Sequence, residues 1–259
     1  MTSFPAVSEA APVLEAQGLT VSWEGAPVLA DVSFSVGAGQ LVCLVGRSGS
    51  GKSTLFHALA GLSVPDEGRV LLEGRDVTGR PGSVAYMLQK DLLLPERTVL
   101  DNVALPLLLK GVPKAEARDR ASERFGRFSL EGSQRLYPSQ LSGGMRQRAA
   151  LLRTCLMDDP VVLMDEPFSA LDAFTRQDMR AWLLGLVDAI GLTVLLVTHD
   201  VDEAVALADR ILVLAGDPVA GVPSRIAGEV DVACPRADRE EFMLSSAALE
   251  AKREVLALL

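Results

Sequence analysis

The sequence of 259 residues has few aromatic side chains (5%), two histidines, three cysteines and no long apolar run. Cys43, Cys155 and Cys234 are far apart and form no CxxC pair, which argues against a disulfide framework or a zinc site. The apolar residues come in short bursts, whereas a membrane-spanning helix needs about 20 in succession. Residues 1–12 lack a basic region followed by an apolar run, so we expect no secretory signal and a cytoplasmic location.

Basic charge is also scarce, because 34 acidic residues face 25 basic ones and the net charge is −9. Proteins that bind nucleic acid electrostatically usually carry a basic stripe, and none is visible in the sequence. We therefore expect no nucleic-acid partner, and the acidity is typical of a protein kept in solution by its charge. Hydrophobic residues make up 49% of the chain, enough for a sizeable core in one large α/β domain or two modest ones.

Short apolar strands alternate with helical patterns along most of the chain. Residues 14–36 and 68–73 predict antiparallel strands, whereas 92–157 favours helices. Further strands are expected at 41–45, 161–164, 193–197 and 210–214, with helices starting near Lys52 and over 145–157, 173–190 and 201–208. Buried strands separated by helices predict an α/β fold with a mainly parallel sheet. The stretch 222–234 predicts a strand pair or a loop, and 240–259 an amphipathic helix packed on the body.

A glycine-rich segment lies between the apolar strand at 41–45 and the helix that starts near Lys52. It reads Gly46-Arg47-Ser48-Gly49-Ser50-Gly51-Lys52-Ser53 and fits the pattern GxxxxGK[ST]. Its glycines let backbone N–H groups curl around an anion, and the next helix points its positive end at the same place. We therefore predict a nucleoside-triphosphate site. Lys52 is expected to contact the β- and γ-phosphates and Ser53 to ligate Mg²⁺, while Thr54 and the loop residues surround the phosphates.

Two further segments suit the same chemistry. The apolar run 161–164 ends in Asp165, which is predicted to hold Mg²⁺, and in Glu166, which is predicted to polarise the attacking water. The segment Leu141-Ser142-Gly143-Gly144-Met145-Arg146-Gln147-Arg148 opens a second helix with a serine and two glycines. A second helix N-terminus suits another phosphate contact, which a head-to-tail dimer needs and a single chain does not.

From about residue 14 to 214 the sequence resembles the ABC ATPases, because LSGGMRQR matches the signature of that family and the other motifs follow in order. The resemblance implies that Trp23 stacks on adenine, and that Gln89 senses Mg²⁺ and water. It also implies that Asp172, in the segment 169–172, lies at a dimer interface. His199 then contacts the γ-phosphate and Glu166 is the catalytic carboxylate, while Ser142, Gly143 and Gly144 contact the nucleotide of a second subunit.

The resemblance implies a P-loop NTPase core of residues 14–90 and 158–240, including an N-terminal antiparallel β subdomain. It also implies an inserted α-helical subdomain of residues 91–157 and a C-terminal helix of residues 240–259. Expected cofactors are ATP and Mg²⁺. Expected partners are a second copy of the chain, membrane-spanning permease subunits and, through them, an extracytoplasmic substrate-binding protein. The expected location is the inner face of the cell membrane.

Two directions of transport remain open at this point. Residues 165–176 and 198–204 look like those of importers of the nitrate, sulfonate and taurine group, which includes carriers of thiamine pyrimidine precursors. Residues 102–106 have some likeness to ATPases that move lipids or lipoproteins. Where many relatives carry a tryptophan in the leucine-rich stretch after Gln89, this chain has Glu96. We expect import, and the transported molecule is not encoded in these motifs.

Overall fold

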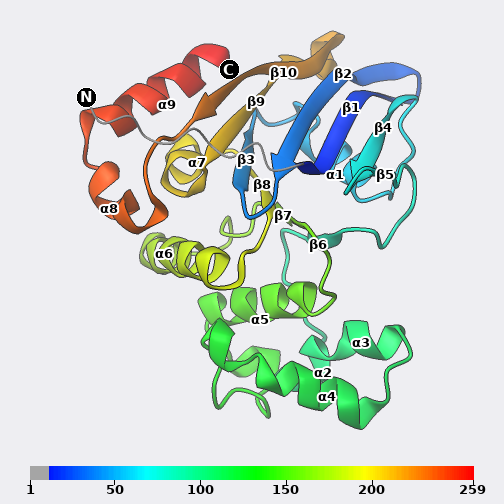
Figure 1. The fold of residues 1–259 in the computed structure, drawn as a ribbon, viewed down its shortest axis with the longest axis vertical. Coiled ribbons are helices and arrows are strands. Elements are labelled where there is room, and N and C mark those ends of the chain that lie inside the picture. Colours follow the sequence, from blue (N-terminus) through cyan, green and yellow to red (C-terminus); the bar gives the residue numbers. More distant parts are fainter. Residues whose placement is uncertain (1–11) are drawn as a thin grey trace.

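A computed structural model describes residues 12–259 of the chain. The segment in which the sequence predicts no secretory signal lies, except for its last residue, outside the described residues. In the described part, ten strands form one sheet in the order β5-β4-β1-β2-β10-β9-β3-β8-β7-β6 (Figure 1). The sheet has a parallel half and an antiparallel half, as the alternation of patterns predicts.

The parallel half consists of the short apolar strands. They are β3 (Leu41–Val45), β6 (Ala85–Met87), β7 (Val162–Asp165), β8 (Val194–Thr198) and β9 (Arg210–Asp217). Neighbours in the order β9-β3-β8-β7-β6 all pair in parallel. Alternate residues of β3 enter different core clusters: Cys43 lies on one face of the sheet, and Val42 and Leu44 on the other. The strand is apolar throughout because both of its faces are buried.

The antiparallel half comprises β1 (Pro12–Trp23), β2 (Ala26–Gly37), β4 (Glu67–Leu72) and β5 (Arg75–Asp76). Glu24 and Gly25 connect β1 to β2, and both have positive φ angles of 50° and 82°. A two-residue turn of this kind matches the twist of the two strands that it joins. The segment 222–234 contains a single strand, β10 (Val222–Asp231), rather than a pair. It pairs antiparallel to β9 and in parallel with β2, and so connects the two halves.

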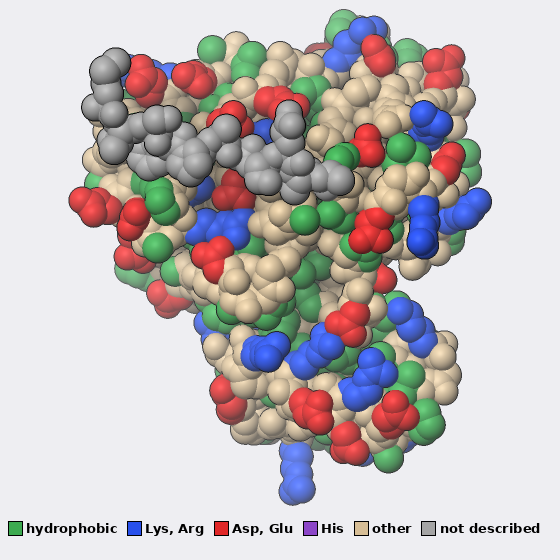
Figure 2. Space-filling model, viewed as in Figure 1, with side chains coloured by type: hydrophobic (Ala, Val, Ile, Leu, Met, Phe, Trp, Pro, Cys, Tyr) green, Lys and Arg blue, Asp and Glu red, His purple; other side chains and the backbone are tan. Residues whose placement is uncertain are grey.

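Helices cover the parallel half and build a separate lobe. Those beside the sheet are α1 (Lys52–Leu59), α6 (Ala173–Ile190) and α7 (Val201–Leu207). The lobe contains α2 (Val99–Val103), α3 (Leu105–Leu109), α4 (Lys114–Glu123), α5 (Gly143–Cys155) and two short 3-10 turns, η1 (Gly126–Phe128) and η2 (Pro138–Gln140). Figure 2 shows the molecule narrowing between sheet and lobe, with acidic and basic side chains intermixed on the visible face. None of the helices in residues 12–259 has the length and apolarity to cross a membrane.

The C-terminal segment departs from the single helix predicted over 240–259. It contains η4 (Arg236–Asp238), α8 (Arg239–Phe242) and α9 (Ser246–Leu258). The break occurs because Ser245 leaves the helical conformation and caps α9, its side chain accepting a hydrogen bond from the Ala248 N–H at 3.2 Å. The helix α9 then packs against α7 and β10 (Figure 1). The predicted packing on the body is therefore confirmed, although the helix is shorter.

Candidate functional site

The loop between β3 and α1 has the conformation of an anion cradle. Gly49 and Gly51 have φ angles of 82° and 87°, a region that side chains rarely adopt. A Cβ atom on Gly46 would lie 2.6 Å from the carbonyl oxygen of Leu214, so only glycine fits there. These positions explain why the motif needs its glycines.

Lys52 folds back over this loop. Its Nζ donates hydrogen bonds to the carbonyl oxygens of Gly46 at 2.7 Å and Arg47 at 2.8 Å. Burial lowers the pKa of Lys52, and the nearby carboxylates of Glu166 and Asp165 act in the opposite direction. The side chain thus braces the loop and places a positive charge inside it, where a phosphate group would add further stabilisation.

Asp165 and Glu166 stand at the carboxyl end of β7. The Tyr86 hydroxyl on β6 donates a hydrogen bond to Asp165 Oδ2 at 3.3 Å. Burial raises the pKa of Asp165, and the neighbouring Glu166 charge raises it further. Glu166 has a φ angle of 44°, which is unusual for a residue with a Cβ atom. Strained backbone of this kind is common at functional sites.

Two polar side chains contact the Glu166 carboxyl group. His199 follows β8, and its Nδ1 lies 3.0 Å from Glu166 Oε1. Gln89 follows β6, and its Nε2 donates to Glu166 Oε2 at 3.3 Å and to Ser169 Oγ at 3.2 Å. Because β6, β7 and β8 run in parallel, their carboxyl ends bring these residues together from distant parts of the sequence.

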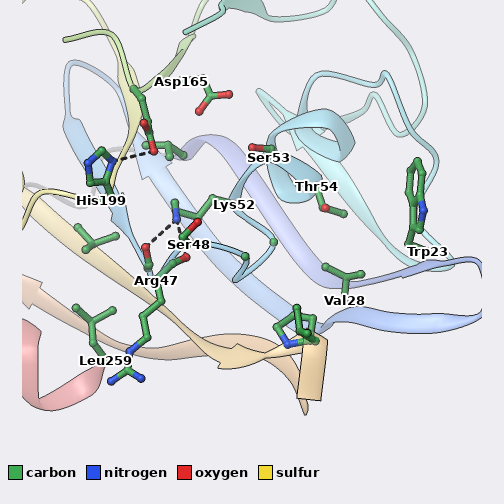
Figure 3. A pocket seen from close by; sticks show the side chains of 18 of the residues that line it. Trp23, Val28, Arg47, Ser48, Lys52, Ser53, Thr54, Asp165, His199 and Leu259 are labelled. Carbon is green, nitrogen blue, oxygen red and sulfur yellow. Dashed lines mark hydrogen bonds and ion pairs between the residues drawn. The ribbon is translucent and has the colours of Figure 1, made fainter. Parts of the chain in front are cut away.

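These groups lie around one cavity with a volume of about 990 Å³. In Figure 3, Lys52 lies between Trp23 on one side of the cavity and His199 on the other. The predicted site residues that line it are Trp23, Gly46, Ser48, Gly49, Gly51, Lys52, Ser53, Thr54, Asp165, Glu166 and His199. The cavity is therefore built by the residues that the sequence singles out for binding and hydrolysing a triphosphate.

Other predicted residues lie outside the cavity lining. Gln89 contacts the site residue Glu166, and Ser50 is a buried residue of the loop itself. Ser142 caps α5, where its Oγ accepts a hydrogen bond from the Met145 N–H at 3.3 Å. A Cβ on Gly143 would lie 3.1 Å from Leu171, so the serine-glycine turn packs on the segment that ends in Asp172. The turn therefore contacts the segment before Asp172, and neither the turn nor Asp172 lines the cavity.

Several cavity residues have no signal in the sequence. Val28 comes from β2, Pro218 and Val219 from the turn after β9, and Leu259 from the segment after α9. Arg47, which the motif leaves free to vary, also lines the cavity. Apart from Arg47, which belongs to the loop, no spacing rule connects these positions to the glycine-rich loop, because strand pairing in the sheet and the packing of α9 bring them there.

An ABC transporter family model matches residues 29–169, more than half of the chain. The formylaminopyrimidine import ATP-binding protein ThiZ of Halalkalibacterium halodurans is 44% identical over 195 residues, covering 75% of this chain and 76% of its own length. The chain belongs to the ABC transporter family. It is an ATP-binding domain of that family and an ATPase, as the sequence predicts.

Other relatives support the same assignment. The taurine import ATP-binding protein TauB of Pseudomonas putida is 43% identical over 208 residues, or 80% of this chain and 79% of its own. A sulfate/thiosulfate import ATP-binding protein CysA from Synechocystis is 43% identical over 74% of this chain. The chain spans only 55% of the length of that relative.

Solved structures share the fold of this ABC ATPase. The dimeric structure of the bacterial ABC transporter cassette MJ0796 has a TM-score of 0.71 and 29% identity, covering 85% of this chain and 99% of its own. A post-hydrolysis dimer of the same cassette, bound to ADP and Pi, has a TM-score of 0.69. The ADP conformation of the cassette MJ1267 has a TM-score of 0.74 at 22% identity, with 93% of this chain and 98% of that one covered, and shows the fold alone.

Proposed function

We propose that this ABC ATPase is the ATP-hydrolysing subunit of an importer. Two copies in a head-to-tail dimer couple ATP binding and hydrolysis to import through separate permease subunits, at the inner face of the cell membrane. A substrate-binding protein outside the cytoplasm delivers the substrate. The names of ThiZ and TauB favour import over movement of lipids or lipoproteins. One observation carries the proposal: the cavity holds the hydrolytic groups, and the serine-glycine turn of residues 142–144 lies outside it.

Nucleotide binding is assigned to the cradle. The backbone N–H groups of the glycine-rich loop and the Lys52 ammonium hold the phosphates, and Trp23 provides a face for the base. Mg²⁺ fits the donors, because the Ser53 hydroxyl and the Asp165 carboxylate line the cavity and Mg²⁺ prefers oxygen ligands. The raised pKa of Asp165 supports this, since a nearby cation would stabilise its ionised form. When bound, Mg²⁺ supplies positive charge that offsets the charge of the phosphates.

Hydrolysis is assigned to the cluster around Glu166. Its carboxylate orients a water molecule for in-line attack on the γ-phosphate. His199, 3.0 Å from Glu166, contacts the γ-phosphate and, with Lys52, stabilises the charge that develops on it. Gln89 connects this cluster to the helical lobe along the chain, because it contacts Glu166 and lies between β6 and the first helix of the lobe, α2.

The serine-glycine turn completes the site of a second copy in this proposal. Ser142 is exposed at the N-terminus of the 13-residue helix α5, where free N–H groups and the helix dipole favour an anion. In one chain it lies away from the cradle, so the phosphates that it contacts belong to the other chain. The dimers of MJ0796 provide a structural precedent for pairing of such cassettes.

The Glu166→Gln variant tests this function. Glutamine preserves the size of the side chain but lacks the negative charge that orients water. We expect hydrolysis to fall at least about a hundredfold, the lower end of the range for loss of a general base, while ATP binding is retained. Size-exclusion chromatography with light scattering should therefore detect a monomer without nucleotide and a stable dimer with Mg-ATP.

A double variant with Lys52→Ala added is the control, because it removes the cradle lysine and should stay monomeric with Mg-ATP. Hydrolysis by Glu166→Gln at the wild-type rate would contradict the role of Glu166. A monomer with saturating Mg-ATP bound would contradict the composite site.

A further inference from the structure

The turn between β9 and β10 presents an exposed apolar side chain. Val219, in the 3-10 turn η3 (Pro218–Ala220), is 91% exposed. The turn is held in shape at both ends, because Asp217 Oδ1 accepts a hydrogen bond from the Ala220 N–H at 3.1 Å and Gly221 has a φ angle of 80°. A valine at the tip of a braced turn is thus kept in one place although no core covers it.

The turn faces the nucleotide cavity. Pro218 and Val219 line it together with Trp23 and Val28. The strand pairing explains this position, because Ser224 of β10 pairs with Leu29, the neighbour of Val28. The β1–β2 hairpin and the η3 turn, which are distant in the sequence, therefore bring apolar side chains to the same cavity.

This apolar group adjoins the cradle. A Cβ atom on Gly51 would lie 2.8 Å from Val28 Cγ1, so Val28 packs directly on the phosphate loop. Trp23 is 71% exposed and, in Figure 3, lies on the side of Lys52 away from His199. A nucleotide whose triphosphate binds between the cradle and Glu166 would place its base on this apolar side of the cavity.

We propose that the η3 turn, through Val219, forms an apolar wall of the subsite that holds the nucleotide base. This inference rests on the proposed function and adds to it a residue that no motif contains. The faces of a purine are apolar, and covering them with Trp23, Val28 and Val219 removes apolar surface from water on both partners. A single exposed valine is ordinary on a protein surface; its place in the cavity, beside two other apolar residues, sets Val219 apart.

The test compares Val219→Ser with Val222→Ser. Val222 is 56% exposed on the same hairpin and does not line the cavity. Both valines are exposed, so neither substitution disturbs the core. Isothermal titration calorimetry measures the Kd of each protein for Mg-ATP and for inorganic triphosphate, which has no base. The comparison separates the contribution of the base subsite from that of the cradle. We expect Val219→Ser to raise the Kd for ATP about five- to tenfold and to leave the Kd for triphosphate unchanged. Val222→Ser should match the wild type for both.

Unchanged ATP affinity in Val219→Ser would overturn the inference. Equal weakening of ATP and triphosphate would also overturn it, because the effect would then belong to the cradle. A wild-type protein that binds neither probe would contradict the proposed function itself, and that result is distinguishable because it needs no variant.

Discussion

At the scale of single residues, the cavity concentrates groups whose charged forms are unfavourable without a ligand. Burial and the adjacent Glu166 raise the pKa of Asp165, while burial lowers the pKa of Lys52. Asp172, outside the cavity, shows the opposite behaviour for a carboxyl group. Hydrogen bonds from the Thr175 hydroxyl at 2.6 Å and the Thr175 N–H at 3.0 Å lower its pKa. Charge in the cavity thus opposes folding, whereas charge at Asp172 supports it.

Asp165→Asn is predicted to stabilise the nucleotide-free protein. The amide has no charge to bury, and its oxygen still accepts the Tyr86 hydrogen bond. We expect the Tm at pH 7 to rise by about 2–4 °C, which corresponds to roughly 1 kcal/mol for a chain of this size. Binding of Mg-ATP should weaken in the same variant. Differential scanning fluorimetry, with and without Mg-ATP, measures both effects.

The pH dependence of this effect follows from the sign of the pKa shift. Because the folded-state pKa of Asp165 is raised, ionisation destabilises the fold as pH rises through that value. Below the unfolded pKa the carboxyl is neutral in both states, so the advantage of Asp165→Asn should disappear in acid. Asp172→Asn is the opposite control, because the lowered pKa of Asp172 contributes stability above its unfolded value that is lost as pH falls. A Tm that does not rise in Asp165→Asn at pH 7 would contradict the inference that the ionised Asp165 carboxylate destabilises the fold.

At the scale of elements, the C-terminal helix α9 anchors the cavity residue Leu259 to the rest of the fold. Val255 is fully buried, and Lys252 Nζ forms an ion pair with Asp202 Oδ1 of α7 at 2.6 Å. Leu258 packs on β10, since a Cβ on Gly228 would lie 2.8 Å from its Cδ1. Leu259, which lines the cavity, follows directly. The position of Leu259 therefore depends on the packing of α9.

Val255→Ala should lower the free energy of unfolding by about 2 kcal/mol, the cost of removing two buried methyl groups and leaving a small cavity. Urea unfolding followed by circular dichroism measures this difference. Leu256→Ala is the matched control on the exposed side of the same helix, because Leu256 is 60% exposed, and should change the value by less than about 0.5 kcal/mol. Equal effects of the two variants would mean that α9 does not fold as part of the core.

At the scale of the whole molecule, the cradle and the serine-glycine turn are separate sites of one chain, because residues 142–144 do not line the cavity. The proposed dimer brings the turn of one copy to the phosphates of the other. Ser142→Asp and Ser142→Asn separate this contact from helix capping, because aspartate and asparagine cap helices equally well. Only aspartate places a negative charge near the phosphates.

In the Glu166→Gln background, we expect Ser142→Asn to retain the ATP-dependent dimer and Ser142→Asp to weaken it at least about a hundredfold, since like charges at an interface cost several kcal/mol. Sedimentation equilibrium over a range of protein concentrations measures the dimer Kd. The thermal stability of the two monomers should agree. A strong dimer in Ser142→Asp would exclude the turn from phosphate contact.

The sequence by itself determined the features that depend on neighbouring residues. Runs of apolar residues specified β3, β7 and β8, because strands buried on both faces need no polar positions. Glycines 46, 49 and 51 specified the cradle, because the loop needs backbone angles and close approaches that side chains prevent. Ser142, with the two glycines after it, marked where α5 begins.

Only the tertiary structure decided which distant residues meet. Glu166, His199 and Gln89 converge because three parallel strands end at the same edge, an arrangement that the motif order suggests but does not locate in space. Val28, Val219 and Leu259 join the cavity through the sheet order β2-β10-β9 and the packing of α9, which no local pattern encodes. Interactions between neighbouring residues determine the backbone conformation of each segment, whereas packing between distant segments determines which residues line the cavity.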